Sequence, residues 1–178
     1  PEGNWVHYWT GNEFKGNQTV TVDAPLYGKA GLPMFVKAGA IIPLMPEMSY
    51  IYEKEPEPIT LDVYPEKDKT SAYICRDSES PKGPFTKTIF KCSEDEDTIE
   101  ISIGESDVSY ELWVHCDEPC SVKVNSKRLK KLEDKSSYDS AESGWYFGPD
   151  CFFAAEKMAT LNIKLPETAG AHLIRIGK

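Results

Sequence analysis

Short runs in which polar and apolar residues alternate recur along the chain. Alternation with a period of two places one set of side chains on each face of a β-strand, and Val, Ile, Thr and Tyr favour that conformation. Each such strand buries one face and exposes the other, as in an antiparallel sandwich. The pattern predicts strands at 18–23, 60–64, 98–103, 121–124 and 161–165.

The clearest predicted β-hairpin lies between Thr86 and Ile103. Its arms are expected at 88–92 and 98–103, joined by five polar, mostly acidic residues at 93–97 that suit an exposed tip. Residues 128–133 carry a helix-like pattern that is too short to be stable by itself. The strand signals and the turn residues between them predict an all-β fold of antiparallel β-sandwich type.

A change in composition divides the chain into two consecutive small β domains. Residues 1–46 are rich in aromatic residues, glycine and proline, whereas 47–58 are polar and interrupted by proline. Proline cannot donate to a sheet ladder, so this stretch should not continue a strand. The sequence predicts one β domain at 1–50 and a β-sandwich at 59–178.

The charge and the cysteine content limit which partners and which cellular compartment the sequence favours. With 29 acidic and 20 basic residues the formal charge is −9, which disfavours nucleic acid and membrane surfaces as partners. The five cysteines fit no regular disulfide framework and are interpreted as reduced thiols, which favours the cytoplasm. The sequon at 17–19 keeps secretion as an alternative. Because the sequence opens at Pro1 without methionine, we expect a piece of a longer protein.

An ordered series of motifs fills the first 46 residues. It consists of PEGNW at 1–5, YWTG at 8–11, VDAPL at 22–26 and PMFVKAGAIIP at 33–43. The series resembles the segment that follows the catalytic barrel in glycoside hydrolase family 31, the α-glucosidase and α-xylosidase family. Residues 59–65 and 122–127 resemble, more loosely, parts of that family's distal C-terminal sandwich. The resemblance implies a partial proximal C-terminal domain at 1–50 and a distal one at 59–178.

The resemblance implies a role outside catalysis. The family's two catalytic aspartates belong to the barrel, and no stretch like W-x-D-M-N-E occurs in this sequence. A barrel of about 250 residues also exceeds the chain. We therefore expect a cofactor-free, inactive module that braces the catalytic (β/α)8 barrel of a retaining α-glycoside hydrolase.

The same resemblance places a further strand before Pro1, so we expect the first sheet to have an unpaired edge. Such an edge would expose backbone groups and apolar side chains such as Val20, Val22, Ile41 and Ile42. Residues 1–46 should then associate through that edge or be less ordered, while 59–178 form a self-sufficient sandwich.

Two acidic pairs have a spacing that could suit the catalytic carboxyls of a glycosidase: Asp77 with Glu79, and Asp95 with Asp97. No apolar residues surround the second pair to raise the pKa of one carboxyl, and both pairs are interpreted as solvated loops.

The run HCDEPC at 115–120 contains several metal-ligating residue types but has no second motif to complete a zinc site. We interpret Cys116 and Cys120 as flanking a turn and expect no metal.

Sugar binding is the alternative function. Carbohydrate sites stack aromatic rings on the apolar faces of sugars. Trp145 and Tyr146 follow Gly144 in a predicted polar loop, and Trp113 lies in a predicted strand. These three residues are the candidate oligosaccharide-binding residues, with an aromatic cluster at the edge of the sandwich as the competing interpretation. Trp5 and Trp9 are expected in the core or facing the barrel.

Overall fold

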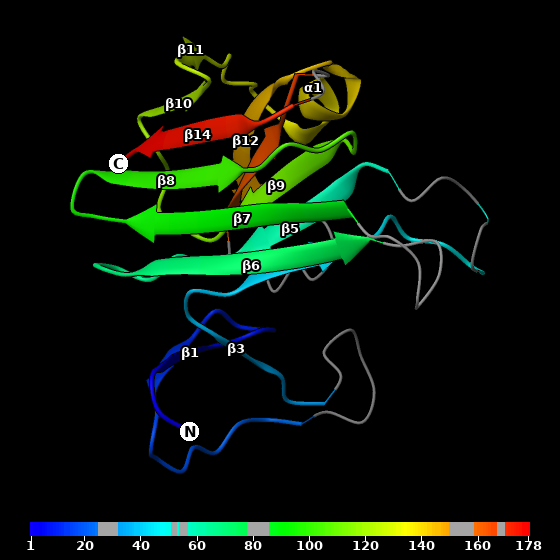
Figure 1. The fold of residues 1–178 in the computed structure, drawn as a ribbon. Coiled ribbons are helices and arrows are strands. Elements are labelled where there is room, and N and C mark those ends of the chain that lie inside the picture. Colours follow the sequence, from blue (N-terminus) through cyan, green and yellow to red (C-terminus); the bar gives the residue numbers. More distant parts are fainter. Residues whose placement is uncertain (25–31, 51–52, 54–56, 78–85, 150–158, 167–169) are drawn as a thin grey trace.

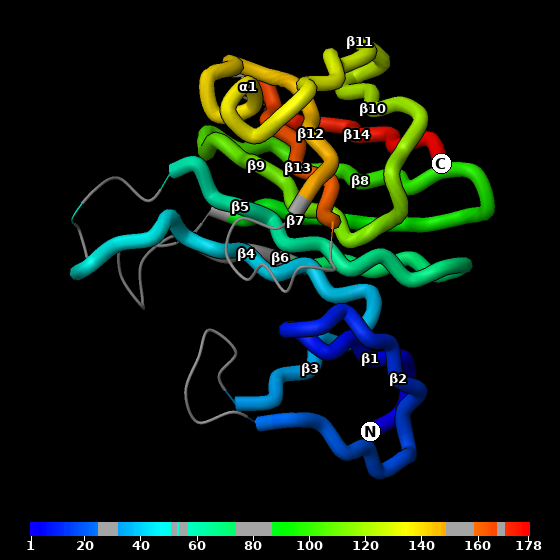
Figure 2. Tube along the Cα trace, turned by 180° about the vertical axis from the view of Figure 1, so that it is seen from behind, coloured from blue at the N-terminus to red at the C-terminus, as the bar shows by residue number. Residues whose placement is uncertain are grey.

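The computed structural model describes residues 1–24, 32–50, 53, 57–77, 86–149, 159–166 and 170–178. These residues form fourteen strands and one short helix, which confirms the all-β prediction. Two sheets stack face to face and a small third sheet lies beyond one end of them, as Figures 1 and 2 show from opposite sides.

One layer of the sandwich is a six-stranded antiparallel sheet with the order β11-β10-β14-β8-β7-β6. Its strands are β6 (Thr70–Asp77), β7 (Thr86–Glu94), β8 (Thr98–Ile103), β10 (Ser121–Val124), β11 (Lys127–Arg128) and β14 (His172–Gly177). The long strand β6 is the last one at its end of this sheet, so one of its two edges is unpaired within it.

The second layer is a five-stranded sheet with the order β12-β13-β9-β5-β4. Its strands are β4 (Ile41–Leu44), β5 (Ile59–Val63), β9 (Tyr110–Val114), β12 (Gly144–Pro149) and β13 (Ala159–Lys164). All neighbours are antiparallel except β5 and β9, which run parallel. The antiparallel sandwich prediction is confirmed, with this one parallel pair as an addition.

The core between the two sheets consists mainly of aliphatic side chains from alternate strand positions, with a few aromatic rings such as those of Phe90 and Trp145. In β8 the burial repeats with a period of two, and Ile99, Ile101 and Ile103 are at most 1% exposed. From the facing sheet, the fully enclosed side chains are Leu61, Val63, Leu112, Val114, Leu161 and Ile163. Burying each such side chain contributes roughly 1.5–3 kcal/mol, so this apolar interior is the main source of stability.

The predicted hairpin is confirmed as β7 and β8, although its first arm extends to Glu94. The connection is therefore shorter than expected. The carboxylate of Asp95 closes it by accepting hydrogen bonds from the backbone N–H groups of Asp97 (2.9 Å) and Thr98 (2.7 Å). This contact gives the acidic tip a structural role, because Asp side chains stabilise turns in this way.

The strand predicted at 18–23 is wrong, because these residues are not in a strand. Alternation alone does not make a strand, which also needs a neighbour to accept and donate hydrogen bonds. Beyond β2 the chain turns at Asn17, where φ is 58°, and leaves the small sheet.

The small sheet has the order β2-β1-β3 and contains β1 (Asn4–His7), β2 (Glu13–Lys15) and β3 (Phe35–Lys37). The chain then passes directly into β4, which pairs with β5 of the sandwich. Ile41 is 6% exposed and lies in the sandwich core, so the expectation that it would be exposed is wrong. The pairing with β5 buries it, although it lies before the predicted boundary at 47–58.

The short helix forms after the predicted position. Residues 128–133 hold the end of β11 and a bridge from Lys131 to Trp145, and the helix α1 follows at Lys135–Ser140. Its N-cap residue Asp134 accepts a hydrogen bond from the N–H of Ser137 at 2.7 Å. N-cap chemistry therefore decides where this helix starts. Among the described residues, no helix is long and apolar enough to cross a bilayer.

A cluster of polar side chains holds α1 against the five-stranded sheet. The hydroxyl of the buried Tyr138 donates to the Glu111 carboxylate at 3.3 Å, and the ammonium of Lys164 donates to the Tyr138 carbonyl at 3.0 Å. Burial raises the pKa of the Glu111 carboxyl, while Lys164 and Tyr138 act in the opposite direction. The helix α1 therefore contacts the Glu111 carboxylate, which is partly removed from water in the folded chain.

The core predicts a sharp contrast between two neighbours in β14. Ile176 is fully buried opposite Ile99 and Val122, so Ile176→Ala should lower the free energy of unfolding by about 2–5 kcal/mol. Arg175 is half-exposed and pairs with Glu100, so Arg175→Ala should cost less than about 1 kcal/mol. Urea unfolding of both variants measures the difference, and equal losses would contradict this description of the core.

The raised pKa of Glu111 predicts a pH-dependent effect of Glu111→Gln. In the folded chain this carboxyl holds its proton more tightly than in the unfolded chain, so its contribution to stability falls as the pH rises from the ordinary glutamate pKa through the raised pKa of the folded chain. The difference in melting temperature, variant minus wild type, should therefore increase between pH 4 and pH 7. Thermal unfolding of the exposed control Glu142→Gln should show no such trend, and a flat difference for Glu111→Gln would refute the prediction.

Candidate functional site

The candidate sugar-binding aromatics are not gathered on one exposed surface. Trp145 lies in β12, not in the expected loop, and is only 3% exposed within the sandwich core. Trp113 is 8% exposed and belongs to the opposite face of the same sheet. Neither ring therefore presents an open face on which a sugar could stack.

Tyr146 is the most accessible of the three candidates. It is half-buried and lies in register with Asn162, which in turn pairs with Trp113, so all three lie on the outer face of the sheet. Its phenol lies over Gly148, where a Cβ atom would come within 2.0 Å of the hydroxyl oxygen, and its ring is 6.4 Å from that of Tyr138. These contacts make Tyr146 part of the surface that supports α1.

A buried polar pair that the sequence analysis did not single out joins the ends of β5 and β9. Nε2 of His115 and Oδ1 of Asp62 are 2.6 Å apart, and the two side chains are 10% and 3% exposed. Since a carboxylate only accepts, the shared proton is on Nε2. Tyr64 stacks on the imidazole with the ring centroids 4.0 Å apart. The enclosure suits a structural role, since the ring is covered on one face and its Nδ1 is buried with no hydrogen-bond partner in the described part of the chain.

The other candidate residues from the sequence lie as follows. Cys116 and Cys120 flank the connection between β9 and β10, as expected. Within the described ranges, no three His, Cys, Asp or Glu side chains lie close enough together to hold a metal. Glu79 lies outside the described residues, as does the side chain of Asp77.

Three cysteines are free thiols, namely Cys92, Cys116 and Cys120. Burial raises the pKa of both Cys92 and Cys116 to about 12, so neither is a thiolate nucleophile at neutral pH. The side chains of Cys75 and Cys151 are outside the described residues.

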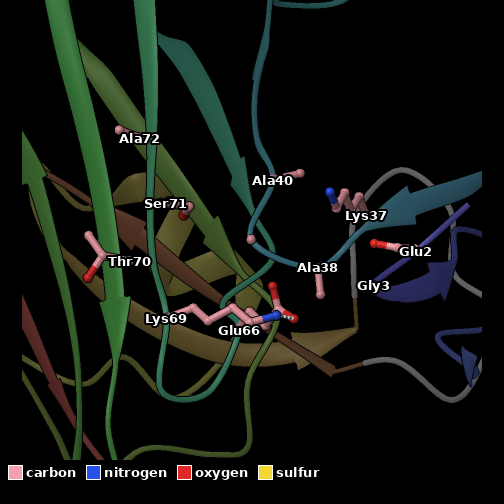
Figure 3. Close-up of a pocket in the computed structure, with 11 residues that line it drawn as sticks. Glu2, Gly3, Lys37, Ala38, Ala40, Glu66, Lys69, Thr70, Ser71 and Ala72 are labelled. Atoms are coloured by element: carbon pink, nitrogen blue, oxygen red, sulfur yellow. Dashed lines mark hydrogen bonds and ion pairs between the residues drawn. The ribbon is translucent and has the colours of Figure 1, made fainter. Parts of the chain in front are cut away.

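A cavity of about 660 Å³ opens between the unpaired edge of β6 and the chain that connects β3 to β4 (Figure 3). We call it the β6 cavity. Its lining is polar or small, comprising Glu2, Gly3, Lys37, Ala38, Gly39, Ala40, Glu66, Lys69, Thr70, Ser71 and Ala72. Four separate stretches of chain therefore converge on it, which explains why no motif in the sequence marks it.

Glu66 is the most constrained charged group of the β6 cavity. Its side chain is 12% exposed, and its Oε1 accepts hydrogen bonds from Nδ2 of Asn4 at 3.1 Å and from Nζ of Lys69 at 2.5 Å. Gly39 lies beside Oε2 with φ at +85°, a conformation that favours glycine. Because Asn4 belongs to β1 and Glu66 follows β5, the hydrogen bond to this carboxylate links the small sheet to the sandwich.

The two faces of the small sheet differ in character. Trp5 and Phe14 are directly paired, and Phe35 packs edge-on against Phe14 with the centroids 5.8 Å apart. On the opposite face, Val6 and Glu13 line a cavity of about 670 Å³ shared with Tyr64, His115 and other sandwich residues. The first set, which we call the aromatic face, is therefore turned away from the sandwich and borders its own apolar cavity of about 270 Å³.

Comparison with known proteins agrees with this architecture. The profile described as "Glycosyl hydrolase family 31 C-terminal domain" matches residues 1–42. The chain is 24% identical over 165 residues to a 1,6-alpha-glucosyltransferase from Sporosarcina globispora, covering 85% of this chain and 13% of the relative. It is 31% identical over 104 residues to an alpha-xylosidase from Saccharolobus solfataricus, covering 57% of this chain and 14% of the relative.

Among solved structures, a glycoside hydrolase family 31 dextranase from Flavobacterium johnsoniae matches with a TM-score of 0.81 and 25% identity. That match covers 100% of this chain and 23% of the dextranase chain, so this chain spans less than a quarter of the length of these relatives. Together, the matching profile, the curated relatives and the shared fold show that the chain resembles the C-terminal β-sandwich region of glycoside hydrolase family 31 enzymes.

Proposed function

We propose that this chain is a non-catalytic module that braces the catalytic (β/α)8 barrel of a retaining α-glycoside hydrolase. The aromatic face of the small sheet carries the proposal. Trp5, Phe14 and Phe35 are all partly exposed there, and they lie on the side away from the sandwich. Partly exposed apolar surface of this kind is typical of an interaction site.

Two further apolar side chains extend the exposed surface of this part of the chain. Leu32 is 81% exposed and Met34 is 43% exposed, and both immediately precede β3. Each side chain exposes apolar surface to water, and covering that surface would stabilise the protein. The greater length of the family relatives supports another domain of the same protein as the cover.

Substituting these two side chains should affect the stability of the isolated chain and that of the longer enzyme differently. Leu32→Ser and Met34→Ser should change the free energy of unfolding of the isolated chain by less than about 0.5 kcal/mol, because both are exposed. In the enzyme that contains the barrel, each should cost about 2 kcal/mol or more if the barrel buries it. Thermal and urea unfolding of both forms measure the contrast.

Met45→Ser is the matched control for this experiment. Met45 is 64% exposed but follows β4, which belongs to the five-stranded sheet and not to the small sheet, so its substitution should be neutral in both forms. The bracing proposal fails if the enzyme tolerates Leu32→Ser and Met34→Ser as well as it tolerates Met45→Ser.

The isolated chain should not hydrolyse p-nitrophenyl α-glucoside or p-nitrophenyl α-xyloside. It lacks the family's nucleophile stretch, and the Asp95 carboxylate is engaged in closing a turn. Release of nitrophenol measures the outcome. Turnover that follows the protein through two independent purification steps would overturn the non-catalytic assignment.

A second candidate function is binding of oligosaccharide. The β6 cavity favours it, because its lining combines carboxylates, ammonium groups and hydroxyls. The names of the relatives (a dextranase, a glucosyltransferase and a xylosidase) also refer to carbohydrates. Of the aromatic candidates, Tyr146 is the most accessible, although it is half-buried and packs near Tyr138.

A further inference from the structure

We propose that the β6 cavity binds a glucose unit of an α-glucan chain and that Oε2 of Glu66 accepts hydrogen bonds from its hydroxyl groups. The inference rests on the second candidate function and assigns it a place other than the predicted aromatic residues. With a volume of about 660 Å³, the cavity lies within the usual range for small-molecule sites.

The Glu66 carboxylate is fixed in advance of any ligand. Asn4 and Lys69 both donate to Oε1, whereas Oε2 has no hydrogen-bond partner among the described residues. Figure 3 shows the carboxylate between Lys69 and the chain at Ala38, within the group of lining residues. A rigid acceptor of this kind binds with little loss of side-chain entropy, because neighbouring contacts already hold the side chain in place.

The lining favours a neutral, hydroxyl-rich ligand over a charged one. The carboxylates of Glu2 and Glu66 balance the ammonium groups of Lys37 and Lys69, so the cavity has no net charge to attract an anion or a cation. The Thr70 hydroxyl can both donate and accept hydrogen bonds, as sugar hydroxyls do, and the Ser71 hydroxyl, which donates to the Cys92 carbonyl at 3.5 Å, can accept one.

The lining also disfavours an apolar ligand. Its only apolar side chains are those of alanines, which offer no pocket for a large aliphatic or aromatic group. The small residues leave open space in the cavity, and the positive φ of Gly39 keeps one of these positions suited to glycine. A polar ring that lies close to the backbone fits this shape better than a bulky hydrophobic side chain does.

The test is a titration of the isolated chain with isomaltotriose and with maltotriose, followed by ¹⁵N NMR shifts and by calorimetry. The expected result is weak binding, with shifts concentrated at 37–40 and 66–72. Glu66→Gln should weaken the apparent affinity about fivefold or more, because it replaces a charged acceptor with a neutral one.

A second variant fills the cavity and does not depend on Glu66. Ala72→Trp should reduce binding about tenfold or abolish it, because Ala72 is an exposed lining residue. Its matched control is Lys91→Trp, at the position directly opposite Ala72 on β7, exposed like Ala72 but not part of the lining. The control should bind as the wild type does, and melting temperatures show whether each variant is folded.

The outcomes separate the inference from the function on which it rests. Binding that survives both Glu66→Gln and Ala72→Trp would retain the oligosaccharide-binding function but overturn the assignment to the β6 cavity. Absence of binding by the wild type would overturn both and leave the bracing role unaffected. Shifts along β6 that grow with protein concentration in the absence of sugar would indicate pairing of two copies at this edge, and would also overturn the inference.

Discussion

The pairing of β4 with β5 is the contact on which the rest of the arrangement depends. Ile41 lies opposite Val63 in this ladder, and just before it the N–H of Gly39 donates to the Tyr64 carbonyl while the N–H of Tyr64 donates to the Ala40 carbonyl. These bonds carry the chain from the small sheet directly into the sandwich. They also set the walls of the β6 cavity and turn the aromatic face away from the main core.

The junction between the small sheet and the sandwich combines two kinds of surface, which suit different kinds of partner. The aromatic face gains free energy when apolar area is removed from water, so a large rigid neighbour suits it. The β6 cavity is polar, and its carboxylate is already ordered by Asn4 and Lys69, so an exchangeable ligand with hydroxyl groups suits it. The small sheet borders both surfaces, since Lys37, which lines the β6 cavity, is paired with Trp5 of the aromatic face.

The Asp62–His115 pair reinforces the one place where the sandwich departs from antiparallel order. Parallel ladders are slightly less stable per residue, and β5 and β9 are the parallel neighbours. The N–H of His115 extends their ladder to the Val63 carbonyl at 3.0 Å, and its ring bonds to Asp62 and stacks on Tyr64. Backbone and side-chain contacts therefore act at the same strand ends.

By itself the sequence determined the fold class, the β7–β8 hairpin and several of the strands that supply the core, although β12 was expected as a loop. Period-two alternation at 98–103 is a local property, and its apolar set is the one that the sandwich buries. The motifs at 1–43 also identified the family, because their order and their Trp, Gly and Pro content are readable without a structure. Local chemistry was sufficient for each of these conclusions.

Only the tertiary structure decided which side chains are accessible and which distant residues meet. Trp145 is of a residue type that often binds sugars, yet cross-strand pairing places it inside the core. The alternating residues at 18–23 do not form a strand. Glu66 had no motif around it and gained its position from Asn4 and Gly39, far away in the chain. The physical reason is that burial and convergence depend on how sheets pair and stack, and a strand's own residues do not specify its neighbours.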